Sequence, residues 1–114
     1  MNLRNAIAMS GVVLLLMTGC ASTPRAVGRD KPRVVQAGCG MCVFHMKGED
    51  ECQLAVKIDG RPYLVVGTDI DDYGDAHAPD GLCNTSREAR VSGEIRNDRF
   101  VAHTFELEPM EIDE

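Results

Sequence analysis

The chain has 114 residues, which allows one domain at most and is too short for a doubly wound nucleotide-binding fold or a barrel enzyme. It carries 12 Lys and Arg residues against 18 Asp and Glu residues, a formal net charge of −6. Nucleic-acid binding requires clustered basic side chains opposite the phosphates, so this charge balance argues against a nucleic-acid partner.

The first twenty residues are typical of an export signal. Arg4 supplies a positive charge, residues 7–17 are mostly apolar, and the stretch ends at Met17-Thr18-Gly19-Cys20. The apolar run is shorter than the ~20 residues needed to span a bilayer, which favours a cleaved secretory signal. The last four residues resemble the lipobox of bacterial lipoproteins, which implies removal of residues 1–19 and lipidation of Cys20. The alternative is an ordinary secretory signal with a chance cysteine.

The lipobox resemblance also implies a location. It places the protein in the cell envelope, bound to a membrane through its lipid anchor. Ala21-Ser22 lacks the Asp that holds lipoproteins in the inner membrane, so an outer-membrane protein facing the periplasm is expected in a Gram-negative host. Residues 20–33, with a net charge of +3 over residues 21–33, are expected to be a flexible tether. Residues 34–108 then form the domain and residues 109–114 an acidic tail; a protein partner is left open.

The domain has the pattern of a small β protein. Alternate positions in residues 52–58 place Cys52, Leu54, Val56 and Ile58 on one face of a strand. Asp59-Gly60 then separates this strand from a second apolar run, which predicts a hairpin. An earlier strand is expected from Val34-Val35 to Val43-Phe44, broken near Gly38-Cys39-Gly40. A short helix is expected over residues 82–89, capped by Asp80, followed by strands over residues 89–95 and 100–107.

This order of elements is that of an OB-fold, a five-stranded barrel with its helix between strands three and four. We therefore predict a mainly β, OB-like barrel. Many OB-folds bind oligonucleotides through basic and aromatic surfaces. Residues 34–114 carry a net charge of −10 and the chain has no Trp, so that function is not expected to accompany the fold.

The last hairpin allows two registers. A two-residue loop at Asn97-Asp98 pairs Ile95 with Phe100, whereas a three-residue loop places both apolar sets on one side of the sheet. We predict the second register because one face of the hairpin must be buried. Its expected pairs are Ile95 with Val101, Gly93 with His103, and Val91 with Phe105, with His103 packed over Gly93.

Four cysteines follow Cys20, and they are the candidate chemical site: Cys39, Cys42, Cys52 and Cys83. An exported domain of this size gains much of its stability from cross-links. We therefore interpret the four cysteines first as two structural disulfides, Cys42 with Cys52 and Cys39 with Cys83 being one possible pairing.

A thiophilic metal site is the second interpretation. The pair Cys39-x-x-Cys42 can present two sulfurs to one ion, and Zn²⁺ would take two further ligands from Cys52, His77 and Cys83. Met41 and Met46 lie beside this pair and would suit copper. The possible cofactors are therefore Zn or Cu, with none certain.

Two other activities receive less support. A redox-active Cys39-Gly40-Met41-Cys42 would normally open a helix after a parallel strand, and the pattern here is not of that kind. Residues 69–80 partly match a calcium loop, although the flanking elements are not two helices. Since no nucleophile–base set or phosphate loop can be argued, we expect a protein that is not an enzyme.

The cysteines also belong to a longer pattern that resembles an uncharacterised family of small exported bacterial domains. The resemblance covers roughly residues 37–107. It implies no activity, but it implies that Cys39, Cys42, Cys52, His77 and Cys83 form one constellation. The motifs that carry it are Cys39-Gly40-x-Cys42, Cys52, the Asp59-Gly60 turn, Gly74-Asp75-Ala76-His77-Ala78-x-Asp80-Gly81-x-Cys83, and Val91-Ser92-Gly93-Glu94-Ile95.

Overall fold

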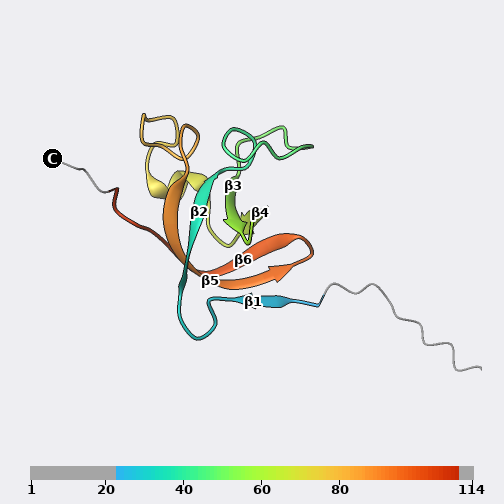
Figure 1. The fold of residues 1–114 in the computed structure, drawn as a ribbon. Helices are drawn as coiled ribbons and strands as arrows, with labels where there is room; N and C mark the ends of the chain where they lie inside the picture. Colours follow the sequence, from blue (N-terminus) through green and yellow to red (C-terminus); the bar gives the residue numbers. More distant parts are fainter. Residues whose placement is uncertain (1–22, 111–114) are drawn as a thin grey trace, which may run out of the picture.

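Six strands and one short 3-10 helix make up residues 23–110, the part of the chain that the computed structural model describes (Figure 1). No helix in this described part of the chain is long and apolar enough to cross a membrane. The elements are β1 (Arg25–Val27), β2 (Arg33–Cys39), β3 (Leu54–Ile58), β4 (Arg61–Val66), η1 (Ile70–Tyr73), β5 (Arg87–Arg96) and β6 (Arg99–Leu107).

Five of the strands close into a barrel. Strands β2, β3 and β4 form an antiparallel meander, and β4 then pairs in parallel with β6. The antiparallel pairs β6–β5 and β5–β2 complete the ring. This closed arrangement confirms the predicted OB-like barrel, in which the connection between the third and fourth barrel strands carries the helical turn.

Strands β1 and β2 together act as one interrupted strand along β5. Val27 of β1 pairs with Gly93, and after a short loop Arg33 of β2 pairs with Val91. The sequence predicts a tether over residues 20–33, but the structure places residues 25–27 in the sheet. Gly28 and Pro32 mark the loop at residues 28–32 instead, where Gly28 adopts a φ of +66°.

The barrel interior is apolar and has a second apolar cluster at one end. Phe100, Ile58, Val56 and Val91 are fully buried in the main cluster. The second cluster is built on Cys39, Leu54, Ile70, Ala76 and Leu82, all of them buried. It places a cysteine in the hydrophobic core at the end of the barrel where the long loops meet.

The predicted helix over residues 82–89 is wrong in position. Residues 81–84 form turns and β5 already begins at Arg87. The carbonyl of Leu82 accepts a hydrogen bond from the Cys39 N–H at 2.7 Å, which ties this segment to β2. The helical turn of the connection is η1, which begins after Asp69. There the Asp69 side chain and the Asp72 side chain form a capping box.

The register of the last hairpin is wrong beside the turn and right beyond it. Ile95 pairs with Phe100, across a two-residue turn at Asn97-Asp98 in which both residues have positive φ. A bulge at Ser92/Gly93 then shifts the register, so that Val91 lies opposite Phe105 as predicted. Because the bulge adds one residue to β6, the hairpin can have a two-residue turn and still place its apolar side chains on one face. His103 is the extra residue and is exposed instead of packed over Gly93.

Candidate metal centre

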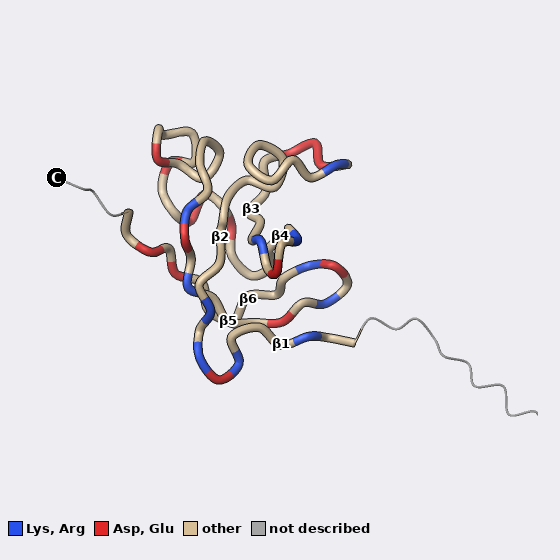
Figure 2. The backbone as a smooth tube through the Cα atoms, viewed as in Figure 1, with Lys and Arg blue, Asp and Glu red and all other residues tan. Residues whose placement is uncertain are grey.

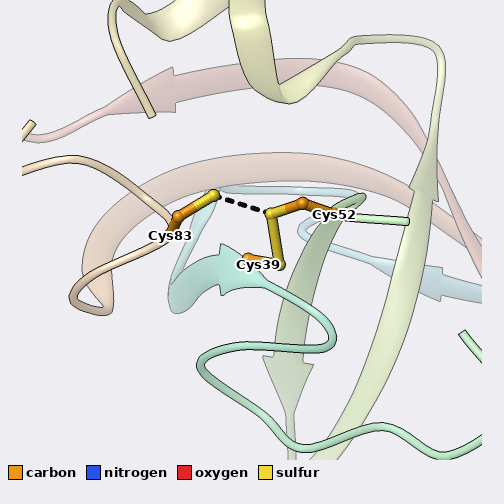
Figure 3. Close-up of side chains that lie close together, drawn as sticks. All are labelled: Cys39, Cys52 and Cys83. Carbon is orange, nitrogen blue, oxygen red and sulfur yellow. Dashed lines mark hydrogen bonds between the residues drawn. A yellow bond between two sulfur atoms is a disulfide. The ribbon is translucent and has the colours of Figure 1, made fainter. Parts of the chain in front are cut away.

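Three cysteine sulfurs converge at the loop end of the barrel. Cys39 ends β2, Cys52 lies two residues before β3, and Cys83 lies in the turns that precede β5. Their Sγ atoms all lie within 4.8 Å of one another (Figure 3). Cys39 and Cys52 form a disulfide with their Cα atoms 5.5 Å apart, and Cys83 Sγ lies 2.7 Å from Cys52 Sγ.

The three-cysteine centre has a buried side and an accessible side. Cys39 is fully buried among Leu54, Ile70, Ala76 and Leu82, whereas Cys52 and Cys83 are half-buried. The centre is therefore reached through Cys52 and Cys83.

Cys42 lies outside this group, although it belongs to the same turn as Cys39. Its N–H donates a hydrogen bond to Cys39 Sγ at 3.4 Å, and the Val43 N–H donates to the Cys39 carbonyl at 2.9 Å. The Cys42 side chain is exposed, and among the described cysteines Cys42 and Cys83 are free. The suggested pairing of Cys42 with Cys52 and of Cys39 with Cys83 is thus wrong. The chain turns after Cys39, where a continuing strand was expected.

The Gly74–Cys83 motif is a scaffold for Cys83. The Asp75 carboxylate accepts the His77 N–H at 2.9 Å, and the Ala76 carbonyl accepts the Cys83 N–H at 2.9 Å. Gly81 lies directly against the Ala76 backbone, and an added Cβ would overlap the Ala76 carbonyl. Because the Leu82 carbonyl accepts a hydrogen bond from the Cys39 N–H, the loop fixes the backbone of both Cys39 and Cys83.

A pocket of about 460 Å³ opens beside the centre, and Cys52, Cys83 and His77 all contribute to its wall. The structure therefore brings together three of the five residues predicted to form one constellation, the converging sulfurs of Cys39, Cys52 and Cys83. His77 is exposed and lines the pocket, and Cys42 lies outside it. Glu51, Asp69 and Asp71 also line the pocket. These three residues are not among those predicted for the site; their carboxylate groups were the available signal.

The surroundings of the centre are negative. Burial raises the pKa of the Cys83 thiol, and the negative charges of Cys42, Asp71 and Asp75 raise it further. Figure 2 shows acidic residues in the loops on this side of the barrel, whereas basic residues gather around β1 and the start of β2. A raised pKa keeps the thiol protonated at neutral pH and makes it a weak nucleophile, and a bound cation would reverse that effect.

Carboxylates of the calcium-like segment already have structural partners. The Asp69 side chain accepts the Asp71 N–H at 3.2 Å, and the Asp72 side chain accepts the Asp69 N–H at 2.9 Å. Thr68 Oγ1 donates to the same Asp72 carboxylate at 3.2 Å. These contacts cap η1, so the segment is accounted for by local structure.

In a comparison with protein families, a family model matches residues 33–108 of the chain. The matching family is DUF6370, described as a family of unknown function. Neither the curated proteins nor the solved structures contain a significant match.

Proposed function

Since the chain belongs to DUF6370, a family without an assigned function, we propose from its geometry that it is a non-enzymatic binding domain that holds a thiophilic metal ion at Cys39, Cys52 and Cys83. The observation that carries the proposal is the convergence of three Sγ atoms within 4.8 Å of one another. They come from three segments that are distant in the sequence. A site of this kind offers donors suited to Zn²⁺ or Cu(I).

The number of sulfurs favours a metal over cross-linking alone. One disulfide uses two sulfurs, and two disulfides require two separate pairs. Here the third sulfur lies 2.7 Å from the second, while the fourth cysteine is exposed. A single ion would account for all three convergent sulfurs. A fourth ligand for Zn²⁺ would come from the pocket, where His77 and solvent are available.

Metal binding by the reduced full-length protein tests the proposal. Native mass spectrometry after addition of Zn²⁺ or Cu(I) should show one bound ion per chain. Cys83→Ser should lose the ion or bind it at least tenfold more weakly. Cys42→Ser should bind like the wild type, because Cys42 lies outside the three-cysteine centre. A reduced wild-type protein that takes up neither ion would overturn the proposal.

A structural role for the cysteines is the second candidate function. It is favoured by the Cα separation of 5.5 Å between Cys39 and Cys52, which lies in the range that a disulfide needs. In that case the protein is an interaction module whose function lies on its acidic surface. The two candidates differ in the reduced state, since a purely structural disulfide leaves a protein without metal affinity.

We also propose that the domain is anchored to the cell envelope through a lipid on Cys20. The support is the signal-like segment that ends at Gly19-Cys20; it lies outside the described residues. In cells, Cys20→Ala should abolish lipid labelling, and globomycin should make the precursor accumulate. A mature protein that is released into the periplasm with a free amino terminus would contradict the anchor. In a Gram-negative host, membrane fractionation should recover the protein with the outer membrane.

A further inference from the structure

The disulfide and the proposed metal site use the same atoms. Cys39 Sγ and Cys52 Sγ form the disulfide, and they are also two of the three convergent sulfurs. Resting on the metal site proposed above, we infer that the centre is redox-controlled: oxidation of Cys39 and Cys52 to the disulfide expels the ion, and reduction restores the site.

The exclusion follows from the chemistry of sulfur. A metal ion binds thiolates, and a sulfur in a disulfide carries no negative charge to donate. When Cys39 and Cys52 are linked, Cys83 Sγ is the one thiolate left among the three convergent sulfurs. The Zn²⁺ site then loses two of its four ligands, and the ion is released.

Hydrogen peroxide is the oxidant in this step. Two metal-bound thiolates lose one electron each and form one S–S bond. Hydrogen peroxide takes up these two electrons together with two protons from the solvent, its O–O bond breaks, and two water molecules leave. The metal ion departs with its charge unchanged, and the Cys83 thiolate takes up a proton from water. A dithiol reductant returns two electrons and two protons, and the site forms again.

The geometry favours Cys39 and Cys52 as the oxidised pair. Their Cα atoms lie 5.5 Å apart, so the bond can open and close by movement of side chains alone. The backbone on both sides is fixed, because Gly40 N–H donates to the Gln53 carbonyl at 2.8 Å and Cys39 N–H donates to the Leu82 carbonyl at 2.7 Å.

The pocket supplies the path for ion and oxidant. Cys52 and Cys83 line it, whereas Cys39 is fully buried. Peroxide therefore meets Cys52 before Cys39, and the sulfenic acid formed on Cys52 would be resolved by Cys39 with loss of water. The acidic side chains Glu51, Asp69 and Asp71 around the same pocket favour the approach of a cation to the reduced site.

The test uses the reduced, Zn²⁺-loaded full chain with one equivalent of hydrogen peroxide. A chromogenic chelator measures released Zn²⁺, and a thiol reagent counts remaining thiols. We expect one Zn²⁺ released for every two thiols lost, and renewed uptake after dithiothreitol. Zn²⁺ that stays bound while two thiols are lost would overturn the inference. So would release accompanied by sulfinic acid in place of a disulfide.

Tryptic mapping identifies the linked pair. Cleavage after Arg33, Lys47 and Lys57 leaves Cys39 and Cys42 in one peptide, so the Cys42→Ser variant makes the assignment unambiguous. In that variant the peptides 34–47 and 48–57 should be joined, with the same Zn²⁺ release as in the wild type. A link from Cys52 to Cys83 would overturn the assigned pair.

Cys83→Ser separates the two proposals. It should still form the Cys39–Cys52 disulfide on oxidation, with a loss of two thiols, although its Zn²⁺ affinity is low. A reduced wild-type protein that takes up no Zn²⁺ refutes the proposed function. A protein that binds Zn²⁺ and keeps it through disulfide formation refutes only the redox control.

Discussion

Gly93 of β5 lies at the bulge, directly against the backbone of β6. A Cβ added there would overlap the Val101 carbonyl oxygen and lie 3.0 Å from Phe100 Cζ. We predict that Gly93→Val lowers the free energy of unfolding by about 1–3 kcal/mol through overpacking. Urea denaturation measures the change. Lys57→Val adds the same side chain on an exposed face of β3 and should change stability by less than about 0.5 kcal/mol; equal losses in both variants would contradict the steric cause.

Asp59 is the residue at which pH dependence can be tested. A hydrogen bond from Arg33, supported by the charges of Arg33 and Arg25, holds the pKa of the Asp59 carboxyl below its ordinary value. A carboxyl with a lowered folded-state pKa contributes stability above its unfolded pKa, near 3.9. That contribution is lost as pH falls through the folded-state value.

Asp59→Asn removes this charge and suits the left-handed conformation at Asp59, where φ is +51°. The wild type should therefore melt at a higher temperature than the variant at pH 5–7. The difference should shrink below about pH 4 and in high salt. A difference that grows on acidification would show that the ion pair is not its source.

At the scale of elements, the turn between β5 and β6 holds a residue other than glycine in a strained backbone conformation. Asp98 has a φ of +61°, which suits Gly better than any residue with a Cβ. We predict that Asp98→Gly raises the free energy of unfolding by about 0.5–1 kcal/mol. Asp98→Ala removes the same exposed ion pair with Arg61 but keeps the strain, so thermal denaturation should rank it below Asp98→Gly.

The same hairpin shows what local patterns can and cannot predict. The apolar positions correctly place Val91 opposite Phe105, because both face the core. They do not reveal that Asn97-Asp98 forms a tight turn, since Asp at a positive φ is disfavoured and no Gly marks the site. The bulge that satisfies both requirements depends on how β6 packs in the closed barrel, which is a tertiary effect.

For the whole molecule, the three-cysteine centre should control stability. The Cys39–Cys52 disulfide spans 13 residues, and closing a loop of that size contributes about 3 kcal/mol in the chain-entropy model. We predict that reduction with a chelator present lowers the free energy of unfolding by this order. Added Zn²⁺ should restore much of it, because the ion binds the folded state. Denaturant curves that coincide with and without reductant would contradict the prediction.

The overall architecture was more predictable than the site. The order of strands is a chain-wide pattern and indicates the OB-like barrel correctly. The cysteine pairing was not predictable, because sequence spacing does not show that the chain turns after Cys39 and leaves Cys42 exposed. Nor does it show that the Gly81–Leu82 segment docks against Cys39. The helix predicted over residues 82–89 rested on local pattern alone. Hydrogen bonds between this segment and β2 favour turns and a strand there instead.

Because β1 belongs to the sheet, the proposed tether between the membrane and the domain is shorter than the predicted residues 20–33. Five chain steps separate Cys20 from Arg25, a reach of at most ~18 Å. Arg25 pairs with Ile95 of β5, and Ala37, near Cys39, pairs with Arg87 of the same strand. The distance along β5 between Ile95 and Arg87 is about 26 Å. β1 and the loops that hold the cysteines lie at opposite ends of the barrel (Figure 1). With Cys20 lipidated as proposed, the three-cysteine centre would lie at the end of the barrel far from the anchored strand.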